Sequence, residues 1–322
     1  MPFLVFNSAE EWASHFGDDG RAAVTVGNFD GLHLGHQKIL RSVRERAGAT
    51  RQRGTVITFD PHPMRILRPE NAPLMIQTLA QRLEGFERMG LEAALVLRFD
   101  RELAQVSAEE FMERILVRCL RAGCILVGAN FRFGHLGAGD VRLLEEFGKH
   151  NGFEVEVVPP VEVGGQVVSS TAIRSAVAIG DVAGAIPLLG RAFSLSGEIR
   201  AGAGRGRTML FPTLNLVPEQ ELRPKLGVYA TESVVDGKIY SSVTNVGTRP
   251  TFDGTGVTIE SHLLAFRENL AEGRMEVRFC ARIRDEQKFS GPEELRAQIA
   301  RDIEEARSYF SERTVAGSSR SD

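Results

Sequence analysis

The chain has 322 residues, of which 25% are charged and 43% are hydrophobic, and its formal net charge is -3. This length allows two ordinary domains, each with its own core, and the balance is typical of a globular protein. The small negative charge gives no electrostatic footprint for nucleic acid or for an anionic membrane. We find no apolar run long enough to span a bilayer and no signal peptide in residues 1–7. These features predict a cytoplasmic protein without membrane or nucleic-acid partners.

The cysteines are Cys119, Cys124 and Cys280. They form no C-x-x-C pair, and an odd number argues against a disulfide framework. We therefore expect small buried side chains in a reducing compartment.

Residues 22–47 predict a strand, a glycine-rich turn and the start of a helix. The apolar run 22–26 breaks at Gly27, and an apolar spacing suited to one helix face begins after His33 and His36. A helix start offers unpaired N–H groups and the positive end of the helix dipole, so the pattern favours a phosphate site. Two histidines three positions apart could also hold a metal, but no third ligand stands at suitable spacing nearby.

Strands alternate with helices through the first half of the chain. The predicted strands are 55–59, 93–97, 124–127 and 155–158, and the predicted helices are 79–89 and 108–120. This order predicts a parallel sheet covered on both faces, in which ligands bind beyond the carboxyl ends of the strands.

Polar motifs follow several of these strands. TFDPHP (58–63) follows one strand and GANFRFG (128–134) follows another, while VSSTAIR (168–174) opens a helix with Ser169 or Ser170 as its N-cap. Each motif alone reads as a turn or a cap. Together they predict the rim of one site.

The second half has a different pattern. A short helix at 181–189 ends at Gly190, and short β-like segments follow from Phe193 onward. Asp236-Gly237 predicts a hairpin, and residues 277–284 alternate with period two, which favours a small barrel or sandwich. A final helix is predicted at 292–310. We place the domains at 1–186 and 187–312, followed by a disordered tail at 313–322.

The motifs resemble, in order, those of bacterial bifunctional riboflavin kinase/FMN adenylyltransferases (FAD synthetases). GNFDGLHLGH resembles the HxGH signature of nucleotidyltransferases, and TFDPHP, GANFRFG and SSTAIR follow it. GRGRTMLFPTLNL, GVYA, TNVGTRPTF, IESHLLAF and ARIRDEQKF resemble the riboflavin kinase module. The resemblance implies a Rossmann-like N-terminal domain and a small antiparallel β-barrel with a terminal helix. It also implies ATP and Mg²⁺, with riboflavin, FMN and FAD as substrates and products.

For the adenylyltransferase site, the resemblance implies that His33 and His36 hold the ATP phosphates, with Ser170, Thr171 and Arg174 assisting. Further nucleotide-binding residues would be Gly27, Asn28, Phe29, Asp30 and Gly35, and flavin-binding residues would be Asn130, Phe131 and Arg132. Phe131 and Phe133 could equally be core residues. Asp60 and His62 would help to shape this site.

For the kinase site, the resemblance implies Glu260 as general base and Thr213 and Asn215 as Mg²⁺ ligands. Gly204 and Arg207 would bind nucleotide, and Arg284 and Asp285 would bind flavin. On a strand, Glu260 would share a face with His262. Without the resemblance, Glu260 reads as an ordinary strand residue and residues 213–215 read as a turn.

The chain departs from the kinase pattern in three places. Leu210 replaces the glycine that usually precedes Phe-Pro-Thr, Ala265 replaces a common aspartate, and residues 269–274 lack the usual Tyr-Gly. A Cβ at Leu210 would enter a loop that depends on glycine. An adenylyltransferase with a weak or only flavin-binding kinase domain therefore stays open. So does a nucleotidyltransferase for another phosphate acceptor, such as pantetheine phosphate. An RNA-binding barrel is disfavoured because a basic, aromatic-studded strand face is lacking.

Overall fold

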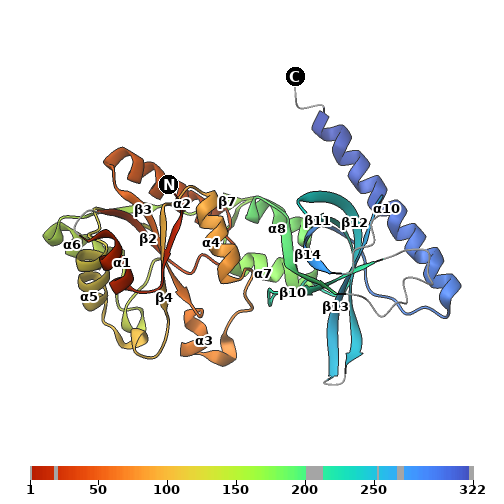
Figure 1. Cartoon of the computed structure of the whole chain (residues 1–322), viewed down its shortest axis with the longest axis horizontal. Coiled ribbons are helices and arrows are strands. Elements are labelled where there is room, and N and C mark those ends of the chain that lie inside the picture. The colour runs from red at the N-terminus through yellow and green to blue at the C-terminus, as the bar shows by residue number, and fades with distance from the viewer. Residues whose placement is uncertain (1, 18–20, 201–212, 252–253, 267–271, 319–322) are drawn as a thin grey trace. The chain divides into compact units, whose positions relative to one another are not determined.

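The computed structural model describes residues 2–17, 21–200, 213–251, 254–266 and 272–318. The chain divides into two units, Met1–Ser170 and Thr171–Asp322, and each is described by itself. Figure 1 shows their elements.

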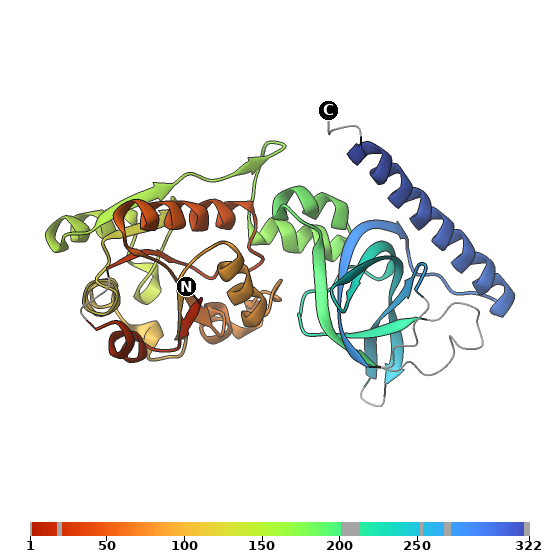
Figure 2. The same ribbon diagram turned by 45° about the horizontal axis from the view of Figure 1, so that its top comes forward.

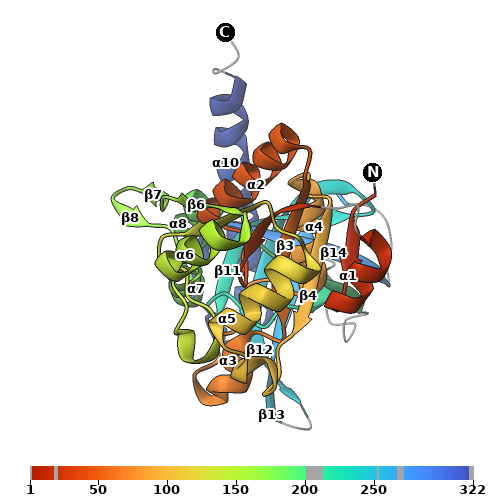
Figure 3. The same ribbon diagram turned by 90° about the vertical axis from the view of Figure 1, so that its left-hand side faces the viewer.

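Unit 1 alternates strands with helices. Its sheet strands are β1 (Leu4–Phe6), β2 (Ala22–Val26), β3 (Arg53–Asp60), β4 (Ala93–Arg98), β5 (Cys124–Gly128) and β6 (Glu154–Val158). Its helices are α1 (Ala9–Phe16), α2 (Leu34–Thr50), α3 (Pro63–Leu67), α4 (Leu79–Arg88), α5 (Ala108–Phe111), the π-helical η3 (Met112–Cys119) and α6 (Val141–Asn151). Short 3₁₀ turns are η1 (Pro69–Asn71), η2 (Leu103–Gln105) and η4 (His135–Gly137). A hairpin of β7 (Glu162–Val163) and β8 (Gln166–Val167) projects from this unit (Figures 2 and 3).

The sheet of unit 1 is six-stranded, with the order β1-β4-β3-β2-β5-β6, and every pairing is parallel. The predicted strands and the parallel sheet are confirmed. From β2 the chain winds outward through β3 and β4, and it then crosses to β5 on the other side of β2. The sheet therefore reverses its strand order between β2 and β5, which is where ligands bind in folds of this class.

Both faces of this sheet are covered, which explains why the central strands β2, β4 and β5 are almost entirely apolar and buried. Side chains of α1, α5, η3 and α6 pack on one face, among them Trp12, Met112 and Leu144. Side chains of α2 and α4 pack on the other, among them Leu40 and Phe86. The sheet is thus a rigid platform for the loops at its carboxyl edge.

Unit 2 begins with two helices and continues as a barrel. Its helices are α7 (Ser170–Ile179), which starts at the last residue of unit 1, α8 (Val182–Leu189) and α10 (Pro292–Ser318). Its strands are β9 (Phe193–Arg200), β10 (Leu214–Pro218), β11 (Gly227–Val235), β12 (Lys238–Thr251), β13 (Gly254–Leu263) and β14 (Gly273–Arg284). The short helix predicted to end at Gly190 is confirmed; Asp181 caps α8, and Gly190 ends it in the left-handed region.

The six strands close into an antiparallel barrel with the order β10-β13-β12-β11-β14-β9. The barrel alternative of the sequence prediction is confirmed, and the sandwich is wrong. The predicted hairpin joins β11 and β12, where Asp236 and Gly237 have φ of 49° and 75°. Two positive φ values are what a tight hairpin turn requires, and Asp-Gly supplies them.

Strand alternation separates the barrel's interior from its outer face. Tyr229, Val277 and Phe279 are fully buried inside, whereas Val228 and Val243 point outward and pack against Ile303 of α10. The helix lies along the outside of the barrel (Figure 2). It continues to Ser318, past residue 313, where the sequence predicts the tail to begin.

The barrel interior also holds a chain of buried hydroxyl groups. Four hydrogen bonds of 2.6–2.8 Å connect five fully buried side chains, which in order are Ser233, Ser242, Thr231, Thr244 and Ser261. Each group finds its partner on another strand or position of the barrel wall, so no polar desolvation penalty is left uncompensated. These hydrogen bonds connect β11, β12 and β13 inside the barrel.

The three cysteines are free and buried, as the sequence predicts. Within the described residues, no helix is long and apolar enough to cross a membrane.

Candidate active sites

The turn after β2 ends in a helix start that is capped by a histidine. His33 is the N-cap of α2, and its Nδ1 accepts a hydrogen bond of 3.2 Å from the backbone N–H of His36. A neutral His33 that accepts at Nδ1 carries its proton on Nε2. The Nδ1 atom of His33 is therefore committed to the start of the helix.

The two imidazoles of this turn lie against each other. The rings of His33 and His36 are stacked, with centroids 3.6 Å apart and an interplanar angle of 17°. Phe29 meets the ring of His36 edge-on at 5.1 Å. His33 is 7% exposed and Phe29 is 2% exposed, so the stacked rings are packed against the protein interior. The HxGH histidines are therefore brought together at the positive end of α2.

Two glycines of the motif are required by close approach. A Cβ at Gly35 would lie 3.1 Å from Cε1 of His33, and a Cβ at Gly27 would lie 3.1 Å from the ring of Phe29. Both distances are tighter than ordinary van der Waals contact. The glycines make room for the aromatic rings that shape this turn.

Asp30 is buried and its carboxylate is occupied by backbone groups. It accepts hydrogen bonds of 3.0–3.1 Å from the N–H groups of Ile76 and Gln77, and its carbonyl oxygen accepts one of 2.8 Å from Ser170 Oγ. Asp30 is 2% exposed. The side chain therefore fixes the loop before α4 next to the turn.

Arg82 on α4 is a residue of this region that the sequence reasoning missed. The residue is 1% exposed, and its guanidinium donates to the carbonyl of Asn28 at 2.8 Å and to Thr58 Oγ1 at 2.9 Å and lies 3.6 Å from the Asp60 carboxylate. Burial lowers the pKa of Arg82, and the carboxylates of Asp30 and Asp60 oppose that effect. The only available signal was an arginine on the apolar side of a predicted helix.

Arg82 thus connects the turn after β2 to the end of β3. It also donates to the carbonyl of Phe59 through both terminal nitrogens, at 3.4 and 3.3 Å. His62, beyond Asp60, caps α3 by accepting from the N–H of Met64 at 3.2 Å. The TFDPHP motif is therefore fixed to the HxGH turn through one buried cation.

The loop after β5 follows one of the two strands between which the strand order reverses. Asn130 and Arg132 are exposed, and Arg132 lies 3.4 Å from the Asp140 carboxylate. Phe131 and Phe133 stack at 5.2 Å, and Phe133 is buried in the core. Core packing accounts for Phe133, whereas Phe131 is partly buried against the same core.

The SSTAIR motif starts α7. Ser170 belongs to unit 1 and reaches the turn through its bond to the Asp30 carbonyl. Thr171 and Arg174 stand in the first turns of α7, in unit 2.

Three of the predicted kinase residues, Asn215, Glu260 and Arg284, belong to one row across the outer face of the barrel. Asn215 on β10 lies directly opposite Glu260 on β13, and Glu260 lies directly opposite Asn245 on β12. The row continues through Val228 on β11 to Arg284 on β14. Since Val228 packs against α10 outside the barrel, the whole row faces outward. Asn245 is a member that the sequence reasoning did not single out, although it stands in the quoted motif TNVGTRPTF.

Arg284 and Asp285 are engaged in ion pairs within the protein. The Arg284 guanidinium forms a bidentate pair with Asp302 of α10, with two distances of 2.8 Å. Asp285 pairs with Arg282 at 2.5 Å and with Lys225 at 3.4 Å. A hydrogen bond from Lys225, with the charges of Arg282 and Lys225, lowers the pKa of Asp285. These contacts anchor α10 and the end of β14.

The predicted nucleotide residues Gly204 and Arg207, and the unusual Leu210, lie outside the described residues. Among the residues the structure describes, no group of three or more His, Cys, Asp or Glu side chains could hold a metal. Thr213 and Asn215 offer neutral oxygens instead, which are hard ligands of the kind Mg²⁺ accepts beside its waters and substrate phosphates.

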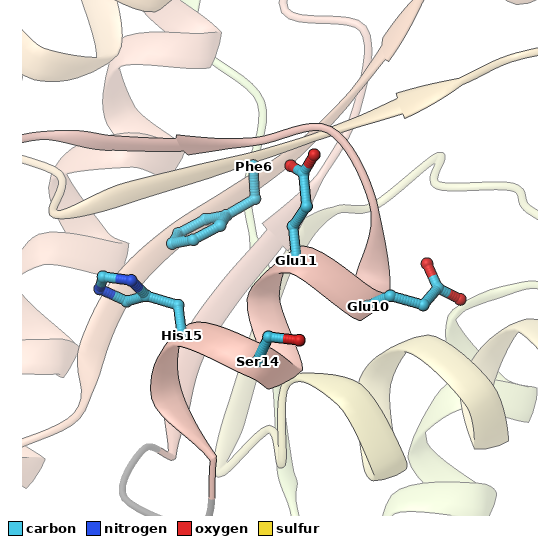
Figure 4. A pocket seen from close by; sticks show the side chains of 5 residues that line it. All are labelled: Phe6, Glu10, Glu11, Ser14 and His15. Atoms are coloured by element: carbon cyan, nitrogen blue, oxygen red, sulfur yellow. The ribbon is translucent and has the colours of Figure 1, made fainter.

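A pocket beside α1 is lined by none of the residues of these motifs. It is lined by Phe6, Glu10, Glu11, Ser14 and His15 (Figure 4). Glu11 accepts from the N–H of Asn7 at 2.7 Å, and its own N–H donates to Ser8 Oγ at 3.1 Å. The Glu11 carboxylate therefore serves the start of α1, and we assign the pocket no part in the chemistry.

Comparisons with known proteins agree with this division. A family model described as FAD synthetase matches residues 16–172, and one described as riboflavin kinase matches residues 189–310. Relatives named bifunctional riboflavin kinase/FMN adenylyltransferase include one from Haemophilus influenzae, 36% identical over 289 residues, covering 89% of this chain and 94% of the relative. Another, from Escherichia coli K12, is 38% identical over 288 residues and covers 89% and 92%.

A solved structure has the same fold along its length. The crystal structure described as a macrolide-efflux protein from Streptococcus pneumoniae has a TM-score of 0.85 and 30% identity, covering 95% of this chain and 99% of that one. Together with the two family models and the curated relatives, this similarity spans both units. The chain belongs to the family of bifunctional riboflavin kinase/FMN adenylyltransferases.

Proposed function

We propose that the chain makes FAD from riboflavin in two steps at two separate sites. Riboflavin and ATP give FMN and ADP on the barrel of unit 2, and FMN and ATP give FAD and pyrophosphate on unit 1. The observation that carries this proposal is the pair of stacked imidazoles at the start of α2, in a chain whose second unit is a riboflavin kinase barrel.

In the adenylyl step, a phosphate oxygen of FMN attacks the α-phosphorus of ATP while the bond to pyrophosphate breaks. Negative charge grows on the departing pyrophosphate. His33 and His36, together with the positive end of the α2 helix dipole, would stabilise that charge. The reaction needs orientation and charge stabilisation and requires no covalent intermediate. Ser170, Thr171 and Arg174 are proposed to help hold the ATP, and Asn130, Phe131 and Arg132 to border the flavin.

In the kinase step, the 5′-hydroxyl oxygen of riboflavin attacks the γ-phosphorus of ATP and the bond to ADP breaks. Glu260 would accept the hydroxyl proton. Thr213 and Asn215 would hold Mg²⁺, which neutralises phosphate charge when bound. Asn215 lies directly opposite Glu260, which supports placing the metal ligand and the base at one site.

We further propose that the protein works in the cytoplasm on small-molecule substrates alone, with the functional boundary near residue 187. That position lies between the two family matches, which end at residue 172 and begin at residue 189. A flavin-binding barrel without kinase turnover remains the alternative, because Leu210 stands in the predicted phosphate loop.

The test is incubation of the purified chain with riboflavin, ATP and Mg²⁺, followed by chromatographic separation of FMN and FAD over time. Accumulation of FMN and then FAD is expected. Failure to convert supplied FMN into FAD would refute the adenylyltransferase assignment. Conversion of supplied FMN without any FMN formation from riboflavin would instead favour the flavin-binding alternative.

A further inference from the structure

Asn245 on β12 belongs to the row of residues that crosses the outer face of the barrel, and it lies directly opposite Glu260. Residues that face each other across antiparallel strands have Cβ atoms about 4.5–5.5 Å apart. Both side chains are half-buried on the outer face of the barrel. An amide on one side of Glu260 and a second amide, that of Asn215, on the other side thus flank the carboxylate.

The backbone beside Asn245 leaves room for its side chain. A Cβ at Gly247 would lie 2.9 Å from Nδ2 of Asn245 and 2.9 Å from a carboxylate oxygen of Glu286. The amide therefore leans along its own strand over Gly247, where any larger residue would displace it. This is a defined position for the amide, set by the absence of a side chain two residues on.

The chemistry of an amide suits a polyol substrate. Asn presents both a donor and an acceptor, whereas an ionised Glu only accepts. The ribityl chain of riboflavin carries adjacent hydroxyl groups, each of which needs both kinds of partner once removed from water. Glu260 can take the proton of the terminal hydroxyl, and a neighbouring amide can hold that hydroxyl or the one beside it.

We propose that Asn245 is the side chain that orients the ribityl hydroxyls of riboflavin toward Glu260. This inference rests on the proposed kinase function of the barrel. Asn245 moves no proton and holds no metal in this scheme; it fixes the direction of the attacking oxygen. Loss of such orientation lowers the rate of the chemical step more than it lowers ATP affinity.

The sharpest variant is Asn245→Thr, because threonine suits a strand but has no amide. We expect it to lower kcat for FMN formation by about 10- to 100-fold, with KM for ATP unchanged within about twofold. Asn245→Asp should lower kcat at least as much, since it places a second carboxylate opposite Glu260. The matched control is Ser241→Ala, on the same strand and the same outer face but opposite Glu232, and it should keep full activity.

Two further measurements distinguish a failure of this inference from a failure of the proposed kinase function. Conversion of supplied FMN to FAD by each variant checks unit 1, and thermal unfolding checks the barrel. If the unaltered chain makes no FMN, the proposed kinase function fails. If it makes FMN and Asn245→Thr makes it with an unchanged kcat, only this inference is overturned. Equal loss of kcat in Asn245→Thr and Ser241→Ala would also overturn it.

Discussion

The imidazole rings of His33 and His36 lie stacked, with centroids 3.6 Å apart, at the start of α2. Because His33 also caps the helix, its two possible roles must be separated by choice of variant. The stack explains why the motif needs a glycine between the histidines, since a Cβ at Gly35 would press on the ring of His33.

Replacing His36 by alanine should abolish FAD formation while FMN formation continues. The loss should be at least about 100-fold, as for removal of one donor from a site of charge stabilisation. His33→Asn is the companion variant, because asparagine still caps a helix but provides no imidazole. We expect a loss of similar size with little change in thermal stability. Equal loss of both activities in either variant would contradict separate sites.

Replacing Glu260 by glutamine should give the opposite pattern. Removing a general base lowers the rate by about 10²- to 10⁴-fold, so FMN formation from riboflavin should nearly stop. Adenylylation of supplied FMN should remain, since Glu260 stands on the barrel strand β13 and has no part in the proposed adenylyl step. Chromatography of samples quenched at successive times, with riboflavin or FMN as substrate, measures the two activities. Normal FMN formation by the variant would rule Glu260 out as the base.

Arg82→Gln should impair adenylylation because it breaks the hydrogen-bonded connection between the turn after β2 and the end of β3. It removes hydrogen bonds to Asn28, Thr58 and Phe59, and we expect a loss of about 2–4 kcal/mol in unfolding free energy of unit 1. Arg88→Gln, an exposed position on the same helix, is the control. FMN formation should persist in both, and unchanged FAD synthesis in Arg82→Gln would show that the connection does not serve the site.

Asp302→Ala should release α10 from the end of β14. It leaves the guanidinium of Arg284, whose side chain is 16% exposed, without its bidentate partner, and such losses cost about 3–5 kcal/mol when fully buried and somewhat less here. Hydrogen exchange of α10 should rise. Glu304→Ala breaks the exposed pair with Arg307 on the same helix and should leave exchange unchanged. Similar exchange in both variants would contradict the anchoring role.

The buried thiols should resist alkylation in the folded protein. Burial raises the pKa of Cys119 and that of Cys280 to about 11. At pH 8 the thiolate fraction is then about 100-fold lower than at a pKa of 9. Since the unfolded thiols ionise first, stability should fall as the pH rises from about 9 to 11. Labelling with iodoacetamide followed by mass spectrometry measures the reactivity of each thiol. Rapid labelling of Cys119 at pH 8 would refute the predicted resistance to alkylation.

Much of this molecule could be predicted from sequence because its signals are local. The strand-turn-helix around His33 follows from an apolar run, glycines and helical spacing, and the hairpin at Asp236 follows from a dipeptide. Arg82 and Asn245 escaped because each is defined by a long-range relationship. Arg82 bonds to residues 23 to 54 positions away, and Asn245 acquires its neighbour Glu260 only through strand register. Neither relationship leaves a mark within a short window of sequence.

The hydrogen-bonded hydroxyl groups inside the barrel limit the changes in length that β13 can tolerate. Ser261 joins this chain through Thr244, while its neighbour Glu260 points the other way, to the outer face. Because strand side chains alternate with period two, a single inserted or deleted residue would bury a carboxylate among the hydroxyls and expose Ser261. Single-residue insertions and deletions in this strand should therefore abolish FMN synthesis, and only changes in steps of two can keep Glu260 outside.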